Sequence, residues 1–465
     1  MGAAPLSDAP AMLHYDSTHF DTRSDGTTSL AEILGAFSYA LDLTEGQPEG
    51  HSLRACWIAS CMAAALRLPA AERRTVYYAT LLKDLGCSSN AARIAELYLA
   101  DDRQVKQEHK LLAVGLGPTL RYVFTRTGQG QRLGARAKAI LAILRDGNAI
   151  VTDLIQTRCT RGADIARQLR FPEPVAQAIA ALDEHWDGSG KPLGLRGDAI
   201  PLAAQLALLA QIVDVFHAAG GPEAAIEEVT VRAGSWFDPA LARCFVLVAR
   251  EPGFWAELVH PALEARVRAF EPEEQRVAVD EDYLDDIAAA FGAVIDAKSP
   301  YTGGHSGRVG DYTAALGKAL GFGGATLRTL KRGAMLHDVG KLAVSSRVLE
   351  KPGKLDDGEW EEMRSHAAHT TAILSRIGPL RDMAAVAGAH HERLDGRGYP
   401  LGLDAMLIAR EARIITVCDF YDALTADRPY RAALPVEQAL AIMGGEVGKA
   451  IDGDVFAALR EIVTK

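Results

Sequence analysis

Imidazole and carboxylate side chains that suit a metal centre crowd the C-terminal part of the chain. Eight candidate ligands lie between positions 305 and 419, although the whole chain of 465 residues has only 13 His; they are His305, His337, Asp338, His366, His369, His390, His391 and Asp419. Imidazole with carboxylate suits first-row divalent metals such as iron, manganese and zinc, and a carboxylate can bridge two of them. Two such metals can activate a water and hold the oxygens of an in-line displacement at phosphorus.

The argument for a metal centre depends on the whole set and not on any one histidine. A single His on a helix is more often a core or surface residue than a ligand, and we interpret His369 in this way. Lys341, a candidate phosphate binder, and the glycine-rich loop 395–402 accompany the other candidates. Adjacent residues on a helix project about 100° apart, so we expect His337 and Asp338 both to face a site between helices.

The elements that must position these residues are predicted to be helices. Apolar residues recur at helical spacing in two segments after residue 280, at Leu284, Ile287, Ala288, Phe291 and Ile295, and at Val309, Tyr312, Leu316 and Leu320. No stretch shows sustained alternation of apolar and polar residues between hairpin turns. The sequence therefore predicts an all-α protein, with one helical bundle in each half of the chain.

The two halves resemble each other. DGSGKPLGL at 187–195 is repeated as DGRGYPLGL at 395–403, and LLKDLG at 81–86 resembles MLHDVG at 335–340. We also match VDVF at 213–216 with CDFY at 418–421. Three landmarks in the same order indicate a tandem duplication. We predict a flexible tail at 1–25, a first domain at 26–270 and a second domain at 280–465.

Five motifs of the second half resemble one family, the HD-GYP phosphodiesterases, a branch of the HD-domain metal phosphohydrolases. They are PYTGGHSGRV (300–309), HDVGKL (337–342), LEKPGKL (349–355), HHERLDGRGYP (390–400) and CDFYDALTADRPYR (418–431). The resemblance covers about residues 280–465. It implies an all-helical domain that binds two or three metals, usually iron or manganese, and hydrolyses cyclic di-GMP to linear products.

The resemblance also implies a role for each matched residue. The implied metal ligands are His305, His337, Asp338, His366, His390, His391 and Asp419. Asp338 would bridge two metals and orient the attacking hydroxide, and Lys341 would bind or polarise the phosphate. Arg428 and Arg431 would hold the anionic substrate, while Tyr399 would line the guanine-binding side.

The sequence departs from part of the family at Tyr301. Some members have a Glu four residues before the first His, and this Glu supplies a ligand to a third metal. A neutral phenol is a poor substitute for that carboxylate at neutral pH. We therefore expect two divalent metals, iron or manganese, per chain.

The first half lacks most of these ligands. His51, Asp84 and Asp214 match the first His, the HD Asp and the last Asp, but Lys83 replaces the His of the HD pair. Further departures are Arg158 near the place of His366, Lys191 in place of the Tyr of GYP, and the absence of two adjacent His in 182–187. Cations at these positions oppose metal binding. We predict a degenerate HD-like domain that serves packing or dimerisation; the alternative is a sensory pocket in which Lys83, Arg158 and Arg161 bind an anion.

Composition narrows the functional classes. The chain has 50 Lys and Arg against 60 Asp and Glu, a formal charge of −10, which argues against nucleic acid as a partner. Its six scattered cysteines are typical of a reducing compartment. We find no signal peptide, and the longest nearly apolar run, 200–213, is too short to cross a bilayer. The prediction is a cytoplasmic protein without a membrane segment.

These observations lead to one main hypothesis and two alternatives. The main hypothesis is a metal-dependent phosphodiesterase that hydrolyses cyclic di-GMP to linear pGpG, GMP or both. The first alternative is an HD hydrolase of another nucleotide, such as a different cyclic dinucleotide. The second is a non-hydrolytic cyclic-nucleotide receptor or interaction protein. A homodimer and a signalling partner protein are compatible with all three.

Overall fold

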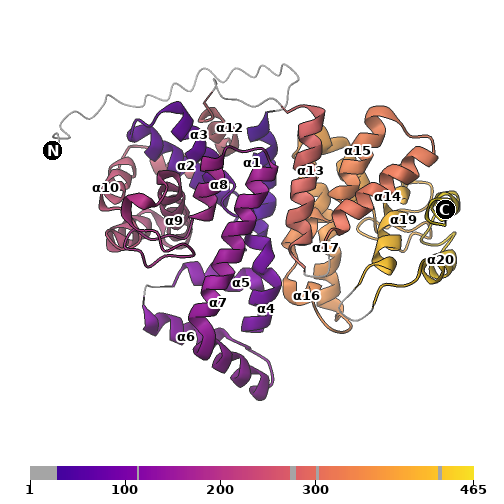
Figure 1. Ribbon diagram of the computed structural model, residues 1–465, viewed down its shortest axis with the longest axis horizontal. Helices are drawn as coiled ribbons and strands as arrows, with labels where there is room; N and C mark the ends of the chain where they lie inside the picture. The colour runs from indigo at the N-terminus through magenta and orange to yellow at the C-terminus, as the bar shows by residue number, and fades with distance from the viewer. Residues whose placement is uncertain (1–28, 113–114, 273–278, 300–302, 428–431, 465) are drawn as a thin grey trace.

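The protein is all-α, as the sequence predicts. A computed structural model describes residues 29–112, 115–272, 279–299, 303–427 and 432–464, and the predicted tail at 1–25 lies outside them. Among the described residues, helices form the regular structure and β-pairing is confined to three isolated bridges. Figure 1 shows two helical halves lying side by side, with α1, α7, α13 and α17 near the middle.

Helix labels run in chain order, and η marks a 3-10 helix. The first half, up to residue 272, contains α1 (Leu30–Thr44), α2 (His51–Ala65), α3 (Ala70–Leu81), η1 (Cys87–Asn90), α4 (Ala91–Tyr98), α5 (Asp102–Lys110), α6 (Leu116–Arg126), α7 (Leu133–Gln168), α8 (Glu173–Ala180), η2 (Gly197–Ala199), α9 (Leu202–Arg232), α10 (Pro239–Val248), α11 (Phe254–Leu258) and α12 (Leu263–Ala269). The second half, from residue 279, contains α13 (Glu281–Asp296), α14 (His305–Ala319), α15 (Gly324–Met335), η4 (Val339–Ala343), α16 (Ser346–Leu349), α17 (Asp357–Leu374), η5 (Gly378–Leu380), α18 (Arg381–Gly388), α19 (Arg410–Thr425), α20 (Val436–Gly444) and α21 (Gly453–Val463).

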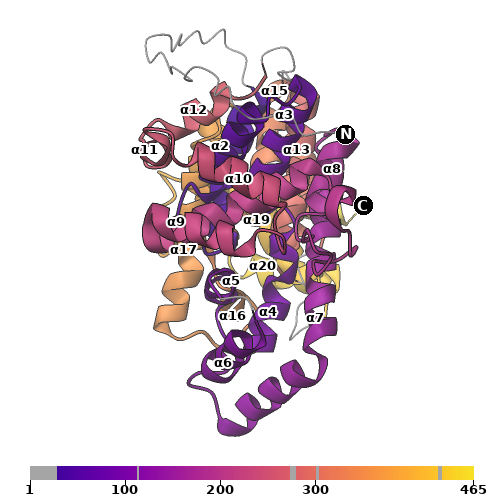
Figure 2. The same ribbon diagram turned by 90° about the vertical axis from the view of Figure 1, so that its left-hand side faces the viewer.

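Matching contacts confirm the tandem duplication. In the first half the Ser52 hydroxyl donates to Asp42 Oδ1 at 2.7 Å, and in the second half the Ser306 hydroxyl donates to Asp296 Oδ1 at 2.7 Å. The helices that carry these serines, α2 and α14, both begin after a glycine with positive φ. A long excursion distinguishes the first half, because α6 and the start of α7 project away from the molecule in both views (Figures 1 and 2).

The two halves share one hydrophobic core. Phe37 of α1 and Phe291 of α13 are both fully buried, and their rings stack with centroids 3.5 Å apart. Around this stack α1 packs on α17 and η4, while α13 packs on α7 and η1. The contact of α1 with α17 corresponds to the contact of α13 with α7, and the contact of α1 with η4 corresponds to that of α13 with η1. The two halves are therefore related by an approximate twofold axis close to the stacked rings, like two subunits of a symmetric dimer.

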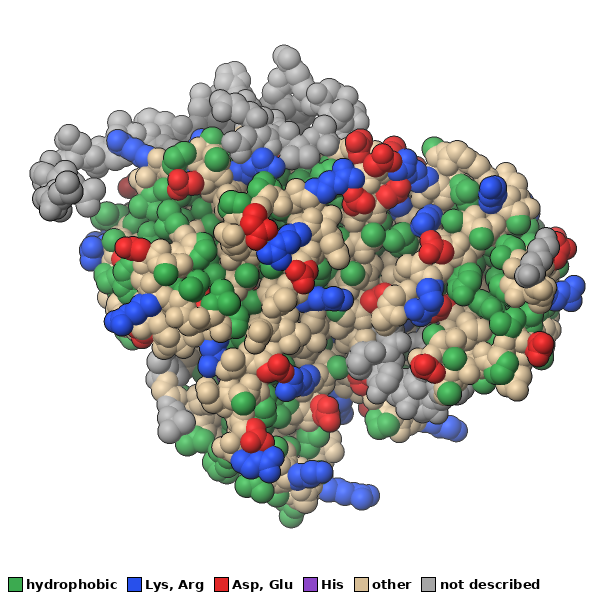
Figure 3. Space-filling view, in the orientation of Figure 1, with side chains coloured by type: hydrophobic (Ala, Val, Ile, Leu, Met, Phe, Trp, Pro, Cys, Tyr) green, Lys and Arg blue, Asp and Glu red, His purple; other side chains and the backbone are tan. Residues whose placement is uncertain are grey.

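The surface and the longest apolar helix bear on possible partners. Basic and acidic side chains are interspersed over the described part of the face in Figure 3, which gives no broad basic surface there for nucleic acid. Helix α9 is long and apolar enough to cross a membrane by length and composition, but 67% of its most apolar window is buried inside the molecule. Packing in the core therefore accounts for its apolar character.

We expect Phe37→Ala to destabilise the whole molecule, because it leaves a cavity in the core that both halves share. Truncation of a buried Phe costs roughly 3–5 kcal/mol in the free energy of unfolding. Urea denaturation followed by circular dichroism measures this change, and Phe124→Ala, at a side chain that is 50% exposed, is the control. Equal stability of the two variants would contradict a shared core at Phe37.

Candidate metal centre

His337 and Asp338 do not lie on a helix, contrary to the sequence-based expectation. Helix α15 ends two residues earlier, and the pair occupies the turn that leads into η4. The cause is the close approach of Gly340 to α17, where an added Cβ would collide with the carbonyl oxygen of His366. The chain leaves the helix to make this approach, and the turn brings Asp338 Oδ1 within 3.5 Å of Nε2 of His366 on α17.

Backbone carbonyls fix the orientation of three histidine rings. In each case Nδ1 lies within hydrogen-bond distance of the carbonyl oxygen three residues earlier: 2.7 Å for His337 and Ala334, 2.5 Å for His366 and Met363, and 2.6 Å for His390 and Ala387. A ring that donates its Nδ1 proton in this way keeps the Nε2 lone pair for a metal. The three rings are thus oriented as ligands before any ion binds.

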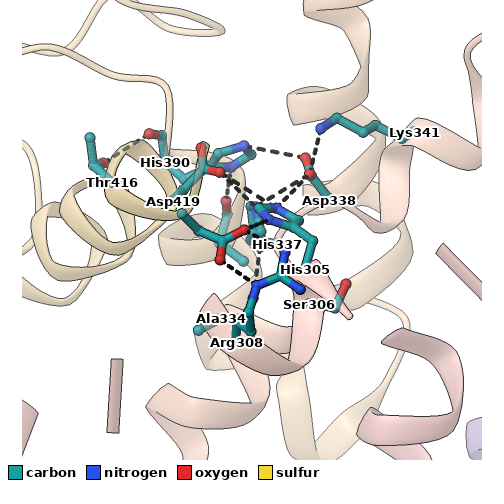
Figure 4. A network of polar contacts seen from close by, with 12 residues as sticks. His305, Ser306, Arg308, Ala334, His337, Asp338, Lys341, His390, Thr416 and Asp419 are labelled. Carbon is teal, nitrogen blue, oxygen red and sulfur yellow. Dashed lines mark hydrogen bonds and ion pairs between the residues drawn. The ribbon is translucent and has the colours of Figure 1, made fainter. Parts of the chain in front are cut away.

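The Nε2 atoms of His305, His337 and His390 face the two oxygens of Asp338 (Figure 4). Oδ2 lies 3.6 Å from Nε2 of His305 and 3.3 Å from Nε2 of His337. Oδ1 lies 3.5 Å from Nε2 of His366 and 3.6 Å from Nε2 of His390. One carboxylate therefore faces one histidine pair with each oxygen, which is the arrangement that lets a carboxylate bridge two cations.

The remaining predicted ligands join the same cluster. Asp419 Oδ1 lies 3.5 Å from Nε2 of His305, and the ring of His391 lies 4.0 Å from that of His390. Three groups have their ligand atoms within 4.8 Å of one another: His366, His390 and His391; His305, His337 and Asp338; His337, His390 and Asp419. The structure thus brings all seven predicted ligands together, whereas His369 belongs to none of these groups.

Unpaired atoms in this cluster fit divalent cations. Nε2 of His305, Nε2 of His337 and Oδ1 of Asp338 are buried and have no hydrogen-bond partner. A buried polar atom without a partner costs about 1–3 kcal/mol. The two nitrogens and the carboxylate oxygen can each donate a lone pair to a divalent metal ion. These donors and their positions therefore suit the two-metal centre that the sequence predicts.

The electrostatics of the cluster favour metal-binding protonation states at most positions. Burial lowers the pKa of His366 to about 4 and the pKa of His391 to about 3, so both imidazoles are neutral at pH 7. Burial would raise the pKa of Asp338, but Lys341 and His337 hold it well below its usual value. Burial likewise disfavours charged His337, yet the carboxylates of Asp338 and Asp419 raise its pKa to about 10. The same carboxylate charge attracts a metal ion.

Two of the predicted substrate-binding residues lie beside the cluster. Nζ of Lys341 is 2.5 Å from Asp338 Oδ2, and its side chain is 24% exposed. The half-buried ring of Tyr399 lies 4.8 Å from the ring of His391. The other two predicted substrate-binding residues, Arg428 and Arg431, lie outside the described residues, as does Tyr301.

The sequence analysis missed an anchor behind His305. Nδ1 of His305 lies 2.7 Å from Asp422 Oδ2, and Arg308 Nε donates to Asp422 Oδ1 at 2.6 Å. A carboxylate in this position fixes the ring and leaves Nε2 toward the centre. The signal was present in the sequence, since Asp422 follows Asp419 by about one turn of α19.

The missed anchor also corrects the alignment of the first half. Nδ1 of His51 lies 2.7 Å from Asp214 Oδ2, and Arg54 Nε donates to Asp214 Oδ1 at 2.6 Å. Asp214 is therefore the counterpart of Asp422, and the match with Asp419 was wrong by three residues. The position equivalent to Asp419 holds Gln211, a neutral side chain.

Internal ion pairs occupy the corresponding place in the first half. Lys83 and Asp84 form a fully buried ion pair. Arg158 pairs with Asp183, and Glu45 Oε2 accepts from Lys110 at 2.8 Å. Glu45 and Asp84 belong, with Cys87, to a further group with metal-ligand spacing. Ammonium groups already neutralise both of these carboxylates, which opposes a cation there, and Lys83 and Arg158 each already pair with a carboxylate of the same half.

Known proteins resemble this chain along most of its length. A family model described as HD domain matches residues 143–241 and 290–455. A 3'3'-cGAMP-specific phosphodiesterase 3 of Vibrio cholerae is 45% identical over 94% of this chain and 95% of its own. A cyclic di-GMP phosphodiesterase of Pseudomonas aeruginosa is 33% identical over 54% of this chain and 62% of its own. The crystal structure of a cyclic GMP-AMP-specific phosphodiesterase from V. cholerae covers 94% of this chain and 98% of its own, with 41% identity and a TM-score of 0.65.

We expect His366→Ala to lower the metal content of the purified protein, because it removes one of the Nε2 atoms that face Asp338. His369→Ala, on the same helix but outside the ligand groups, is the matched control and should keep the wild-type content. Elemental analysis of anaerobically purified protein measures metal per chain. Equal metal content in both variants would remove His366 from the ligand set.

Lys83→Met is expected to destabilise the protein without changing its metal content. The variant leaves Asp84 fully buried without its counter-charge, and breaking such a pair costs about 3–5 kcal/mol. Denaturant unfolding measures the loss, and Lys83→Met/Asp84→Leu should recover part of it because no charge remains. A fall in metal per chain in the companion variant Asp84→Ala would show instead that the first half binds metal.

Proposed function

Because the chain belongs to the HD-domain family and is an HD-type metal phosphodiesterase, we propose that it hydrolyses the cyclic dinucleotide 3'3'-cGAMP. The observation that supports this choice is the 45% identity to a phosphodiesterase named for that substrate, over 95% of the relative's length. The match includes both halves, so the similarity extends to the surroundings of the site as well as to the metal centre. The product would be the linear dinucleotide.

Cyclic di-GMP, the substrate expected from the motifs, is the second candidate. It is favoured by relatives named for cyclic di-GMP that are 32% and 33% identical. These relatives match only 39% and 54% of this chain, against 94% for the 3'3'-cGAMP relative. The longer and closer match supports 3'3'-cGAMP as the first of the two candidates.

In the proposed reaction the seven clustered His and Asp residues hold two divalent ions, iron or manganese. When bound, such ions supply a water of lowered pKa and neutralise charge on the phosphoryl oxygens. Asp338 faces both histidine pairs and so would hold both ions at a fixed separation. The neutral imidazoles His366 and His391 bind without first losing a proton.

Lys341 is the proposed phosphate ligand of the protein itself. An ammonium group has three donors, and the contact with Asp338 Oδ2 uses one of them. The partly exposed side chain leaves the other donors for a phosphate oxygen at the centre. A fixed cation at the point where charge develops stabilises the transition state without reorganisation.

The first half, proposed as a domain of residues 26–270, acts in this scheme as a structural partner of the second, at 280–465. Its ion pairs satisfy its own buried charges, and its α1 packs against α17 and η4 of the catalytic half. We propose that this contact holds the elements that carry His366 and Lys341.

The metal-replete wild type should hydrolyse 3'3'-cGAMP, with a higher kcat/KM than for cyclic di-GMP, and Asp338→Asn should abolish hydrolysis of both. Lys341→Ala should lower kcat by about 10²–10³-fold, the usual effect of removing one preorganised donor, at unchanged metal content. Lys318→Ala, at an exposed residue near the far end of α14, is the matched control. Chromatography of the products gives the rates.

Two outcomes would contradict the proposal. A metal-replete wild type that converts neither dinucleotide would exclude the phosphodiesterase activity itself. Faster turnover of cyclic di-GMP would reverse the order of the substrates. If Lys341→Ala lost metal in proportion to activity, Lys341 would hold the centre together and would not bind phosphate.

A further inference from the structure

An arginine lies between two aromatic rings beside the metal centre. The guanidinium carbon of Arg364 lies 5.5 Å from the ring centroid of Trp360 and 5.6 Å from that of Tyr399. Trp360 and Arg364 are four residues apart on α17, so they share one face of the helix. Tyr399 comes from the distant loop that contains the GYP motif, and the fold brings it to this face.

This three-residue stack leads from the metal ligands to solvent. The ring of Tyr399 lies 4.8 Å from the ring of His391 and 6.2 Å from the ring of His366. At the outer end Trp360 is 44% exposed. A cavity of about 390 Å³ is lined by Asp357, Trp360, Glu361 and Arg364.

The guanidinium of Arg364 has no polar partner among the described residues, unlike those of Arg308 and Arg413. Arg308 pairs with Asp422, and Arg413 pairs with Asp452. Arg364 forms no hydrogen bond or ion pair with any residue in the described part of the chain, although Glu361 lines the same cavity. Its guanidinium is thus flanked by two aromatic rings, and its donors have no partner in the described part of the chain.

Free donors on a guanidinium can bind a phosphate, a carboxylate or a guanine base, and of these three groups only the base can also stack on the neighbouring aromatic rings. The Hoogsteen edge of guanine presents two acceptors, O6 and N7, which an arginine binds with two parallel hydrogen bonds. Adenine presents N7 and an N6 donor, and arginine has no acceptor for that donor. Purines also stack on tryptophan and on arginine planes.

We propose that Arg364, supported by Trp360 and Tyr399, binds the guanine base of the substrate and selects guanine over adenine at this position. The inference rests on the proposed function, since both candidate substrates contain guanine. It assigns a specificity role to α17, the helix that also supplies His366. Arg364 holds the base, and the adjacent centre acts on the phosphodiester.

The test compares Arg364→Ala and Arg364→Lys with a matched control in the holoenzyme. Arg410→Ala is that control, because Arg410 is also an exposed arginine over a ring, 5.8 Å from Phe322, at the start of α19. Three measurements are made on each: kcat and KM for 3'3'-cGAMP, the inhibition constants of GMP and AMP, and turnover of methyl p-nitrophenyl phosphate, a phosphodiester without a purine.

We expect both Arg364 variants to raise KM for 3'3'-cGAMP by about tenfold, in the range of one lost bidentate base contact, while kcat changes little. The wild type should bind GMP more tightly than AMP, and Arg364→Ala should remove that preference. Lysine should not restore it, because it lacks the planar fork. Metal content and turnover of methyl p-nitrophenyl phosphate should equal those of Arg410→Ala.

Each contrary result identifies a different failure. An inactive wild type would contradict the proposed function, whereas an active wild type with an unchanged GMP preference in Arg364→Ala would contradict only this inference. Full recovery in Arg364→Lys would show a simple charge contact with phosphate. Loss of methyl p-nitrophenyl phosphate turnover would show that Arg364 supports the centre and does not read the base.

Discussion

A carboxylate buried among four imidazoles is the constraint on which the second half of the molecule depends. Asp338 has almost no contact with solvent, and desolvation of a charged carboxylate is costly unless cations or donors replace the lost water. Lys341 supplies one ammonium, but Oδ1 of Asp338 and the Nε2 atoms of His305 and His337 still lack partners. The turn before η4, the end of α15 and the close approach of Gly340 to α17 all place this group where divalent cations can neutralise it.

The two halves satisfy the same buried carboxylate in different ways. In the first half Lys83 occupies the position of His337, and its ammonium pairs with Asp84 inside the protein. The ammonium group of Lys83 thus supplies in the first half the positive charge that metal ions are proposed to supply in the second half. The anchor of the first histidine is the same in both halves, since His51 contacts Asp214 as His305 contacts Asp422. The scaffold has therefore been kept while the means of neutralising its charge has changed.

Helical periodicity and motif spacing predicted the helical class, the duplication and the seven clustered residues, because these depend on local pattern and on the order of motifs. They did not predict the turn at His337, since the close contact of Gly340 with α17 is tertiary. The match of Asp214 with Asp419 failed because similar strings of letters do not reveal which carboxylate receives the histidine proton. The stack of Arg364 on Tyr399 joins residues from α17 and a distant loop, and composition alone gives no sign of such a contact.

The internal ion pair of the first half has a consequence for the metal centre of the second. The ammonium group of Lys83 neutralises Asp84, so this buried carboxylate of the first half needs no metal ion as its counter-charge. The first half shares a core with the second half through the stack of Phe37 on Phe291, and its α1 contacts both α17 and η4. The elements that carry His366 and Lys341 are thus held from a side that needs no metal. A ligand set kept in place in this way binds its ions without the entropic cost of ordering the chain at that moment. We infer that the first half, which lacks the proposed ligands, would in this way contribute to the metal affinity of the second half.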